Sequence, residues 1–203
     1  MACFLPRLKE SFIVNLMKTS KLKLISLIPA IGFSLISFIS NSQDIKLTRQ
    51  EKKEAEKAQQ YLNFQALDSL LKNKCFVLEA DWLENGYGVR NHVMSDINFI
   101  MVDSLKAVLQ TGNNLNMGLN GVGGVTAQGN ISGLKIEKDE KNLTFFLKFT
   151  IVSDIGIYDI AMTIYSNNKA RATITGLTPG KLVYAGWIVA LYNSKVYKGR
   201  NRI

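Results

Sequence analysis

The sequence has few of the residues on which much enzyme and metal chemistry depends. Among 203 residues there is one histidine, His92, and there are two cysteines, Cys3 and Cys75. Any Ser-His-Asp or Cys-His arrangement would have to use His92, which turn signals place in a loop. A zinc site of cysteine and histidine ligands needs more of them than this chain has. We therefore expect no catalytic residue, no metal site and no cofactor.

Charge is missing from one stretch near the start, residues 24–43. Three lysines lie just before it, within residues 18–23, and small residues lead up to Ser42. This order is typical of a secretory signal peptide that is cleaved after Ser42. An uncleaved anchor is the alternative, because about 20 uncharged residues just suffice to cross a bilayer. Pro29 and Gly32 weaken that alternative, since both disfavour a permanent membrane helix.

The leader divides the chain into three parts. Met17 opens an ideal signal-peptide start, so we expect residues 1–16 to be an extension of the gene model. Residues 17–42 are then the signal peptide, and residues 43–203 form a single mature domain. Residues 1–42 hold five basic residues and one acidic residue, so their removal lowers the formal charge from +9 to +5.

Processing also bears on cysteine and on location. Removal of residues 1–42 leaves Cys75 as a single thiol, which cannot form an internal disulfide. No cysteine ends the apolar segment, so lipid attachment is not expected. The protein is therefore predicted to be exported to the periplasm or beyond, without a stable membrane anchor after cleavage.

The mature chain begins with a helix signal. Thr48 and Glu51 have the spacing of a capping box, and strong helix formers follow them. The spacing of apolar residues predicts a helix over residues 49–72 whose second half packs on a sheet. The predicted apolar stripe consists of Ala55, Ala58, Leu62, Ala66 and Leu70, widened by Tyr61, Phe64, Leu67 and Leu71.

After residue 73 the apolar period changes to two, which is typical of strands. Short turns connect the expected strands and favour an antiparallel meander over residues 75–192, followed by a basic tail at 193–203. The predicted fold class is α+β, with an N-terminal helix packed on a strongly curved sheet or a half-open barrel. The expected strands are 75–81, 97–102, 105–111, 125–138, 143–151, 158–164, 170–174 and 182–191.

Three carboxylates lie within six residues, at Glu79, Asp81 and Glu84. Strict alternation would place Glu79 and Asp81 on one face of a strand, side by side. A glycosidase-type acid and base need such a pair in a cleft. A solvated sheet face is the plainer interpretation, and we keep Glu79 and Asp81 as weak ligand-binding candidates.

A glycine-rich loop is the other candidate. It lacks the strand–loop–helix context and the following Lys-Ser/Thr of a phosphate-binding loop. A hairpin loop with positive φ is the plain interpretation, although backbone nests can bind anions. The candidate residues are Asn120, Gly121, Gly123, Gly124 and Thr126.

A string of short motifs resembles the domain-of-unknown-function 4251 family of exported proteins from Gram-negative cell envelopes. The resemblance covers roughly residues 70–200 and implies export and one compact domain with an N-terminal helix. It implies no reaction and no ligand, since that family has no assigned function. The motifs are Phe76-Val77-Leu78-Glu79-Ala80-Asp81, Asn98-Phe99-Ile100, Gln110, Asn120-Gly121-Val122-Gly123-Gly124-Val125-Thr126 with Gly129, Tyr158-Asp159-Ile160, Ala170-Arg171-Ala172 and Ser194-Lys195-Val196-Tyr197-Lys198-Gly199.

These observations favour a non-enzymatic envelope domain that binds a protein partner, a small ligand or a surface component. A hydrolase of envelope glycans or peptides using Glu79, Asp81 or Glu84 is one alternative. A protein inhibitor built on a curved sheet is another, and it would present a large exposed aromatic patch instead of a pocket. Nucleic acid is not an expected partner, because export argues against it despite the basic tail.

Overall fold

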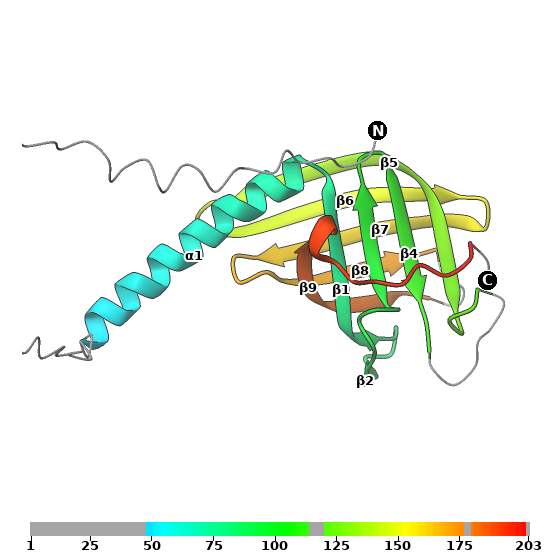
Figure 1. Cartoon of the computed structure of the whole chain (residues 1–203), viewed down its shortest axis with the longest axis horizontal. Helices are drawn as coiled ribbons and strands as arrows, with labels where there is room; N and C mark the ends of the chain where they lie inside the picture. Colours follow the sequence, from blue (N-terminus) through cyan, green and yellow to red (C-terminus); the bar gives the residue numbers. More distant parts are fainter. Residues whose placement is uncertain (1–47, 114–119, 177–179, 202–203) are drawn as a thin grey trace, which may run out of the picture. The chain divides into compact units, whose positions relative to one another are not determined.

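A computed structural model describes residues 48–113, 120–176 and 180–201, which form one helix and an antiparallel sheet (Figure 1). The elements in this part of the chain are α1 (Arg49–Lys72), β1 (Cys75–Glu84), β2 (Arg90–His92), β3 (Phe99–Asp103), β4 (Lys106–Thr111), β5 (Val125–Asp139), β6 (Thr144–Ser153), β7 (Gly156–Tyr165), β8 (Lys169–Thr175), β9 (Leu182–Ala190) and the 3-10 helix η3 (Leu191–Asn193). The predicted helix and the predicted strands are present. Strand β2 was not predicted.

The sheet closes into a barrel. Its strand order is β2-β1-β3-β4-β5-β6-β7-β8-β9, and β1 also pairs with β9, so eight strands form a closed ring. The closing pair runs from Phe76 opposite Ala190 to Glu84 opposite Val183. The predicted curved antiparallel sheet is therefore confirmed, but the barrel is closed and not half-open, because β9 pairs with β1. Only β2 lies outside the ring among the described strands.

Glycine at position 186 makes this closure possible. A Cβ atom there would overlap the carbonyl oxygen of Glu79 and would lie 2.8 Å from the Cα atom of Ala80. Strands β1 and β9 can approach to hydrogen-bonding distance only because Gly186 has no side chain.

The barrel interior is filled by alternate residues of each strand. In β6, Phe145, Leu147, Phe149 and Ile151 are buried, as the period of two predicts. Tyr184 on β9 is fully buried among them. The interior is therefore a packed core in the part of the chain that the structure describes.

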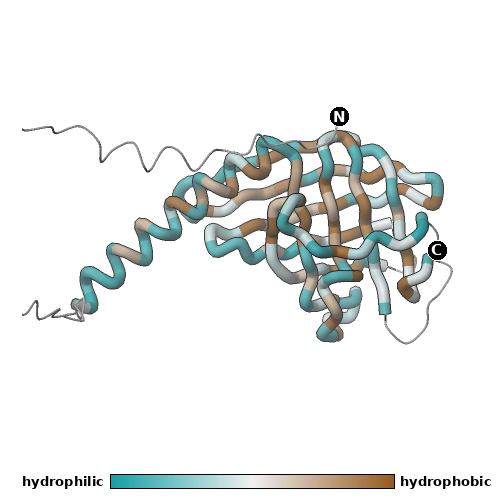
Figure 2. Tube along the Cα trace, in the orientation of Figure 1, coloured by the Kyte–Doolittle hydropathy of each residue, from teal (hydrophilic) through white to brown (hydrophobic). Residues whose placement is uncertain are grey.

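The helix contributes to this core through its second half only. Phe64, Leu67 and Leu71 are buried, and the Phe64 ring stacks on Phe145 with centroids 4.5 Å apart. Ala66 is exposed and Leu62 is 57% exposed, whereas Leu70 is partly buried against the core, so only part of the predicted apolar stripe faces the barrel. The first half of α1 is exposed, and Figure 2 shows it as largely hydrophilic.

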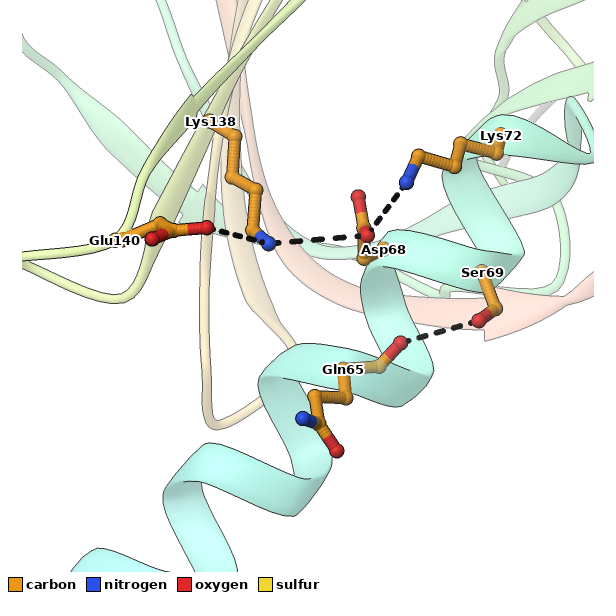
Figure 3. A network of polar contacts seen from close by, with 6 residues as sticks. All are labelled: Gln65, Asp68, Ser69, Lys72, Lys138 and Glu140. Carbon is orange, nitrogen blue, oxygen red and sulfur yellow. Dashed lines mark hydrogen bonds and ion pairs between the residues drawn. The ribbon is translucent and has the colours of Figure 1, made fainter.

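Polar contacts add to the attachment of α1 (Figure 3). Asp68 accepts from Lys72 at 2.8 Å and lies 3.8 Å from Lys138 at the end of β5. Lys138 also pairs with Glu140 at 3.0 Å. Exposed ion pairs contribute about 0–1 kcal/mol, so the buried apolar residues stabilise this contact more than the charges do.

Candidate functional site

The glycine-rich loop uses its polar groups internally. Asn120 is fully buried, and its Oδ1 atom accepts hydrogen bonds from the backbone N–H groups of Val122 and Gly124, both at 3.1 Å. Its Nδ2 atom donates to the Thr126 hydroxyl at 3.2 Å. Two N–H groups that would have lined an anion-binding nest are thus already satisfied. Binding at Asn120, Gly121, Gly123, Gly124 and Thr126 stays a prediction, which this geometry does not support.

Gln110 on β4 connects this loop to the C-terminal segment. Its Oε1 atom accepts from the Thr126 hydroxyl at 3.1 Å and from the Gly199 N–H at 2.7 Å. Its Nε2 atom donates to the carbonyl oxygens of Ile97 and Tyr197, at 3.1 and 2.8 Å. All four hydrogen-bonding positions of the buried amide are therefore used.

The basic tail is fixed on the barrel by these bonds. The Tyr197 N–H donates to the Asp96 carbonyl and the Arg200 N–H to the Asn120 carbonyl, both at 2.8 Å. Leu191 and Val196 pack on the outer side of β1, β3 and β4, which the segment crosses in Figure 1. We conclude that several motif residues of the family resemblance serve a structural role here.

The three carboxylates are held in different surroundings. Glu79 accepts a 2.6 Å hydrogen bond from the Ser194 hydroxyl, and Glu84 binds Arg171 through both carboxylate oxygens at 2.9 Å. The pairing of β1 with β9 shifts between Ala80 and Trp82, so Asp81 is an extra residue in the ladder. This bulge interrupts the alternation that was expected to bring Glu79 and Asp81 side by side.

The bulge also turns Trp82 to the outer side of the barrel. Leu83 pairs with the buried Tyr184, so Trp82 and its partner Ala185 point the other way. Trp187 lies two residues beyond Ala185 and points outward as well. The two tryptophans are diagonal neighbours on β1 and β9, within reach of each other's long side chains.

Both tryptophans are exposed, at 37% for Trp82 and 43% for Trp187, and the chain has no other tryptophan. The Arg90 guanidinium lies 4.5 Å from the Trp82 ring centroid, and His92 contacts the same ring edge-on at 5.0 Å. The Lys169 ammonium lies 5.4 Å from the Trp187 ring. We call Trp82, Trp187, Arg90, His92 and Lys169 the tryptophan patch.

The tryptophan patch was missed at the sequence level for two reasons. Trp82 faces outward only because of a bulge, and the sequence of the ten-residue strand β1 carries no reliable signal for it. Trp187 lies in a nearly continuous apolar run that predicts a strand buried on both faces. His92 was expected in a loop and instead belongs to β2, opposite Trp82.

Other candidate chemistry is sparse in the described residues. They contain no group of three or more His, Cys, Asp or Glu side chains that could hold a metal ion. None of their helices has the length and apolarity to cross a membrane. Cys75 is buried in β1. Its state as a single thiol after removal of residues 1–42 stays a prediction.

Comparisons with known proteins agree with this fold. The crystal structure of a DUF4251 family protein from Bacteroides eggerthii DSM 20697 is similar, with 28% sequence identity and a TM-score of 0.55. The match covers 66% of this chain and 91% of that one. A search of curated proteins finds no match. The family model described as "Domain of unknown function (DUF4251)" matches residues 56–188, and the chain therefore belongs to the DUF4251 family.

Proposed function

We propose that this protein is an exported, non-enzymatic binding domain that holds an acidic protein partner on the tryptophan patch. The observation that carries the proposal is the exposure of the only two tryptophans, which are diagonal neighbours on β1 and β9, each with a cation over its ring. Burial of a large aromatic side chain gains more free energy than burial of a smaller one. Two neighbouring exposed rings therefore favour an interaction surface.

The composition of the patch favours a protein partner. Tryptophan and arginine are the residues most enriched among those that dominate the energy of protein interfaces. Tyr87, which is 95% exposed, follows β1 in the turn toward β2 and adds another aromatic side chain close to the patch in sequence.

The charges favour an acidic partner. Neither Arg90 nor Lys169 has a carboxylate partner among the described residues, whereas nearby Arg171 is paired with Glu84. A partner carboxylate would find two cations beside apolar rings, where water is easily excluded and charge-assisted hydrogen bonds are strong. The predicted formal charge of +5 after processing adds general attraction for acidic surfaces.

A location in the cell envelope is part of the proposal. It is supported by the leader pattern of residues 17–42, which precedes the described residues. A hydrolase that uses Glu79, Asp81 or Glu84 has less support, because Glu79 and Glu84 already have separate partners.

Site-specific photocrosslinking tests the proposal. A photoreactive amino acid at Ala185, between the two tryptophans, is expected to capture an acidic envelope protein in living cells. The same probe at Lys141, on the exposed β5–β6 hairpin, is the matched control. It should not capture the protein that is crosslinked from position 185.

The captured protein is then purified and bound to the unlabelled domain in solution. Loss of the crosslink in the Trp187→Ala variant, together with binding that weakens as salt rises, would support the proposal. Crosslinks to glycan alone, or a protein crosslink that persists in Trp187→Ala, would overturn it.

A further inference from the structure

A second surface feature lies on the outer side of β5 to β8, and it shares no residue with the tryptophan patch. It is an open groove with a cavity volume of about 370 Å³, lined by residues of these four strands. It is independent of the function proposed above, and its residues belong to none of the contacts that fix the C-terminal segment.

A bulge in β5 shapes the groove. The pairing of β5 with β6 shifts between Ser132 and Lys135, and Gly133 has a φ of 63° with no atom near the position of a Cβ. This backbone conformation favours glycine, and the missing side chain leaves space above the sheet. Ala161, on the floor of the groove, adds little bulk.

Two lysines face each other across the bulged strand pair. Lys135 lies directly opposite Lys148 in the ladder, and like charges in this relation are destabilising. Neither ammonium group has an ion pair or hydrogen bond to another described residue. Lys138, three residues along the same strand, is paired with both Asp68 and Glu140. The two lysines thus lie at a concave surface without a direct carboxylate partner, and Asp159 is the one carboxylate that lines the same groove.

The rest of the groove is hydroxylic. The ladder continues from Lys148 through Ala161 to Thr173, and the neighbouring row contains Thr150, Asp159 and Thr175. Asp159 accepts a 2.6 Å hydrogen bond from the Thr150 hydroxyl. One end of the groove is therefore cationic, and the other offers hydroxyl groups and one carboxylate.

We propose that this groove binds a small hydroxylated anion, namely a sugar acid or a sugar phosphate. The anionic group lies between Lys135 and Lys148, where it neutralises the like-charge pair. The hydroxyl groups of the ligand lie toward Thr173, Thr175 and Asp159, whose free oxygen accepts hydrogen bonds. A free sugar derivative and the charged end of a glycan share this chemistry.

Amide chemical shifts of the purified protein during titration test the proposal. Glucuronate and glucose 6-phosphate are expected to shift the groove amides saturably, while neutral glucose leaves them unchanged. Lys148→Gln and Lys135→Gln should each weaken binding at least about tenfold, because each removes one charge-assisted contact. Lys141→Gln, on an exposed hairpin, should bind as the wild type does.

The stability of the free variants gives a second readout. Lys148→Gln relieves the repulsion, so it should raise the melting temperature without ligand and lose the further rise that glucuronate causes in the wild type. Binding that is equal in Lys141→Gln and Lys148→Gln, or equal for glucose and glucuronate, would overturn the proposal. A lower melting temperature of ligand-free Lys148→Gln would also contradict it. A charged oligosaccharide that shifts the same amides as glucuronate would point to a glycan end.

Discussion

At the residue scale, a few buried polar side chains determine how the C-terminal segment is held. Asn98, Gln110, Asn120 and Thr126 are fully buried, and every buried polar side-chain atom of the described residues has a partner. Satisfied networks of this kind fix one arrangement, since any slip would leave a buried group unpaired. Gln110 is the centre of this network. Its amide bonds to the glycine-rich loop, to the segment before β3 and to the C-terminal segment.

Replacing Gln110 with leucine should therefore be costly. The change leaves the buried Ile97 carbonyl and the partly buried Tyr197 carbonyl and Gly199 N–H without this partner, and we expect a loss of about 3 kcal/mol in unfolding free energy. Urea unfolding followed by circular dichroism measures it. Gln128→Leu is the matched control, because the Gln128 side chain makes only a 3.3 Å exposed bond with Lys198. Equal stability of the two variants would contradict this account.

Tyr184 is a fully buried ionisable residue, and it makes the stability of the fold depend on pH. Burial raises the pKa of its phenol above the ordinary value, and the hydroxyl donates to the Gln110 carbonyl at 2.8 Å. The unfolded chain releases this proton near pH 10 whereas the folded chain keeps it, so stability falls as pH rises above about 10.

Tyr184→Phe should lower the unfolding free energy at pH 7 by about 1–2 kcal/mol, because a buried hydrogen bond is lost. The same variant should lose stability less steeply than the wild type between about pH 10 and pH 11. Urea unfolding at a series of pH values checks both expectations. An alkaline decline that is as steep in Tyr184→Phe as in the wild type would show that Tyr184 is not its source.

The residue scale is also where prediction from sequence was weakest. The resemblance named Gln110, Asn120 and Thr126, but a linear motif cannot say whether an amide faces a ligand or a buried carbonyl. Their partners are up to 89 positions away in the chain, as for Gln110 and Gly199. The two tryptophans carried no signal at all, because their exposure depends on a bulge and on the partner strand.

At the scale of elements, substitution of Gly186 tests how the strand pair β1 and β9 closes the barrel. A methyl group at this position would collide with the Glu79 carbonyl and separate β1 from β9. We expect Gly186→Ala to cost about 3 kcal/mol or more, since the backbone of either strand must shift. Hydrogen exchange should show lost protection for the amides of β9.

Gly86→Ala is the control for this change. A Cβ atom at Gly86 would meet its nearest neighbour, the Lys181 carbonyl oxygen, at an ordinary 3.7 Å. The control should retain both stability and exchange protection. A Gly186→Ala variant with wild-type protection in β9 would contradict the role assigned to the glycine.

Most elements could be predicted from local patterns. The capping box and the helical spacing predicted α1 over Arg49–Lys72, and the period of two predicted the strands that form the ring. Barrel closure was missed because it depends on pairing between the distant strands β1 and β9. Strand β2 was missed because it is a three-residue strand of exposed polar side chains, which has no apolar alternation. The predicted helix stripe was too wide, since Phe64, Leu67 and Leu71 are buried as predicted but Tyr61 and Leu62 are exposed.

At the scale of the whole molecule, the described residues form a closed barrel around a buried apolar core, and both candidate binding regions lie on its outer surface. Two outer regions differ in chemistry. The tryptophan patch on β1, β2, β8 and β9 is aromatic and cationic, while the groove on β5 to β8 is cationic and hydroxylic. The first suits a protein surface, and the second suits a small anion.

The most direct test of the central claim is the affinity of the crosslinked partner for tryptophan-patch variants, measured by isothermal titration calorimetry. Trp82→Ala and Trp187→Ala should each weaken binding about 30-fold, which corresponds to about 2 kcal/mol for a dominant interface residue. Tyr61→Ala, which removes an aromatic ring that is 52% exposed on α1, should bind as tightly as the wild type. Wild-type affinity in both tryptophan variants would contradict the claim that this barrel binds its partner through the tryptophan patch.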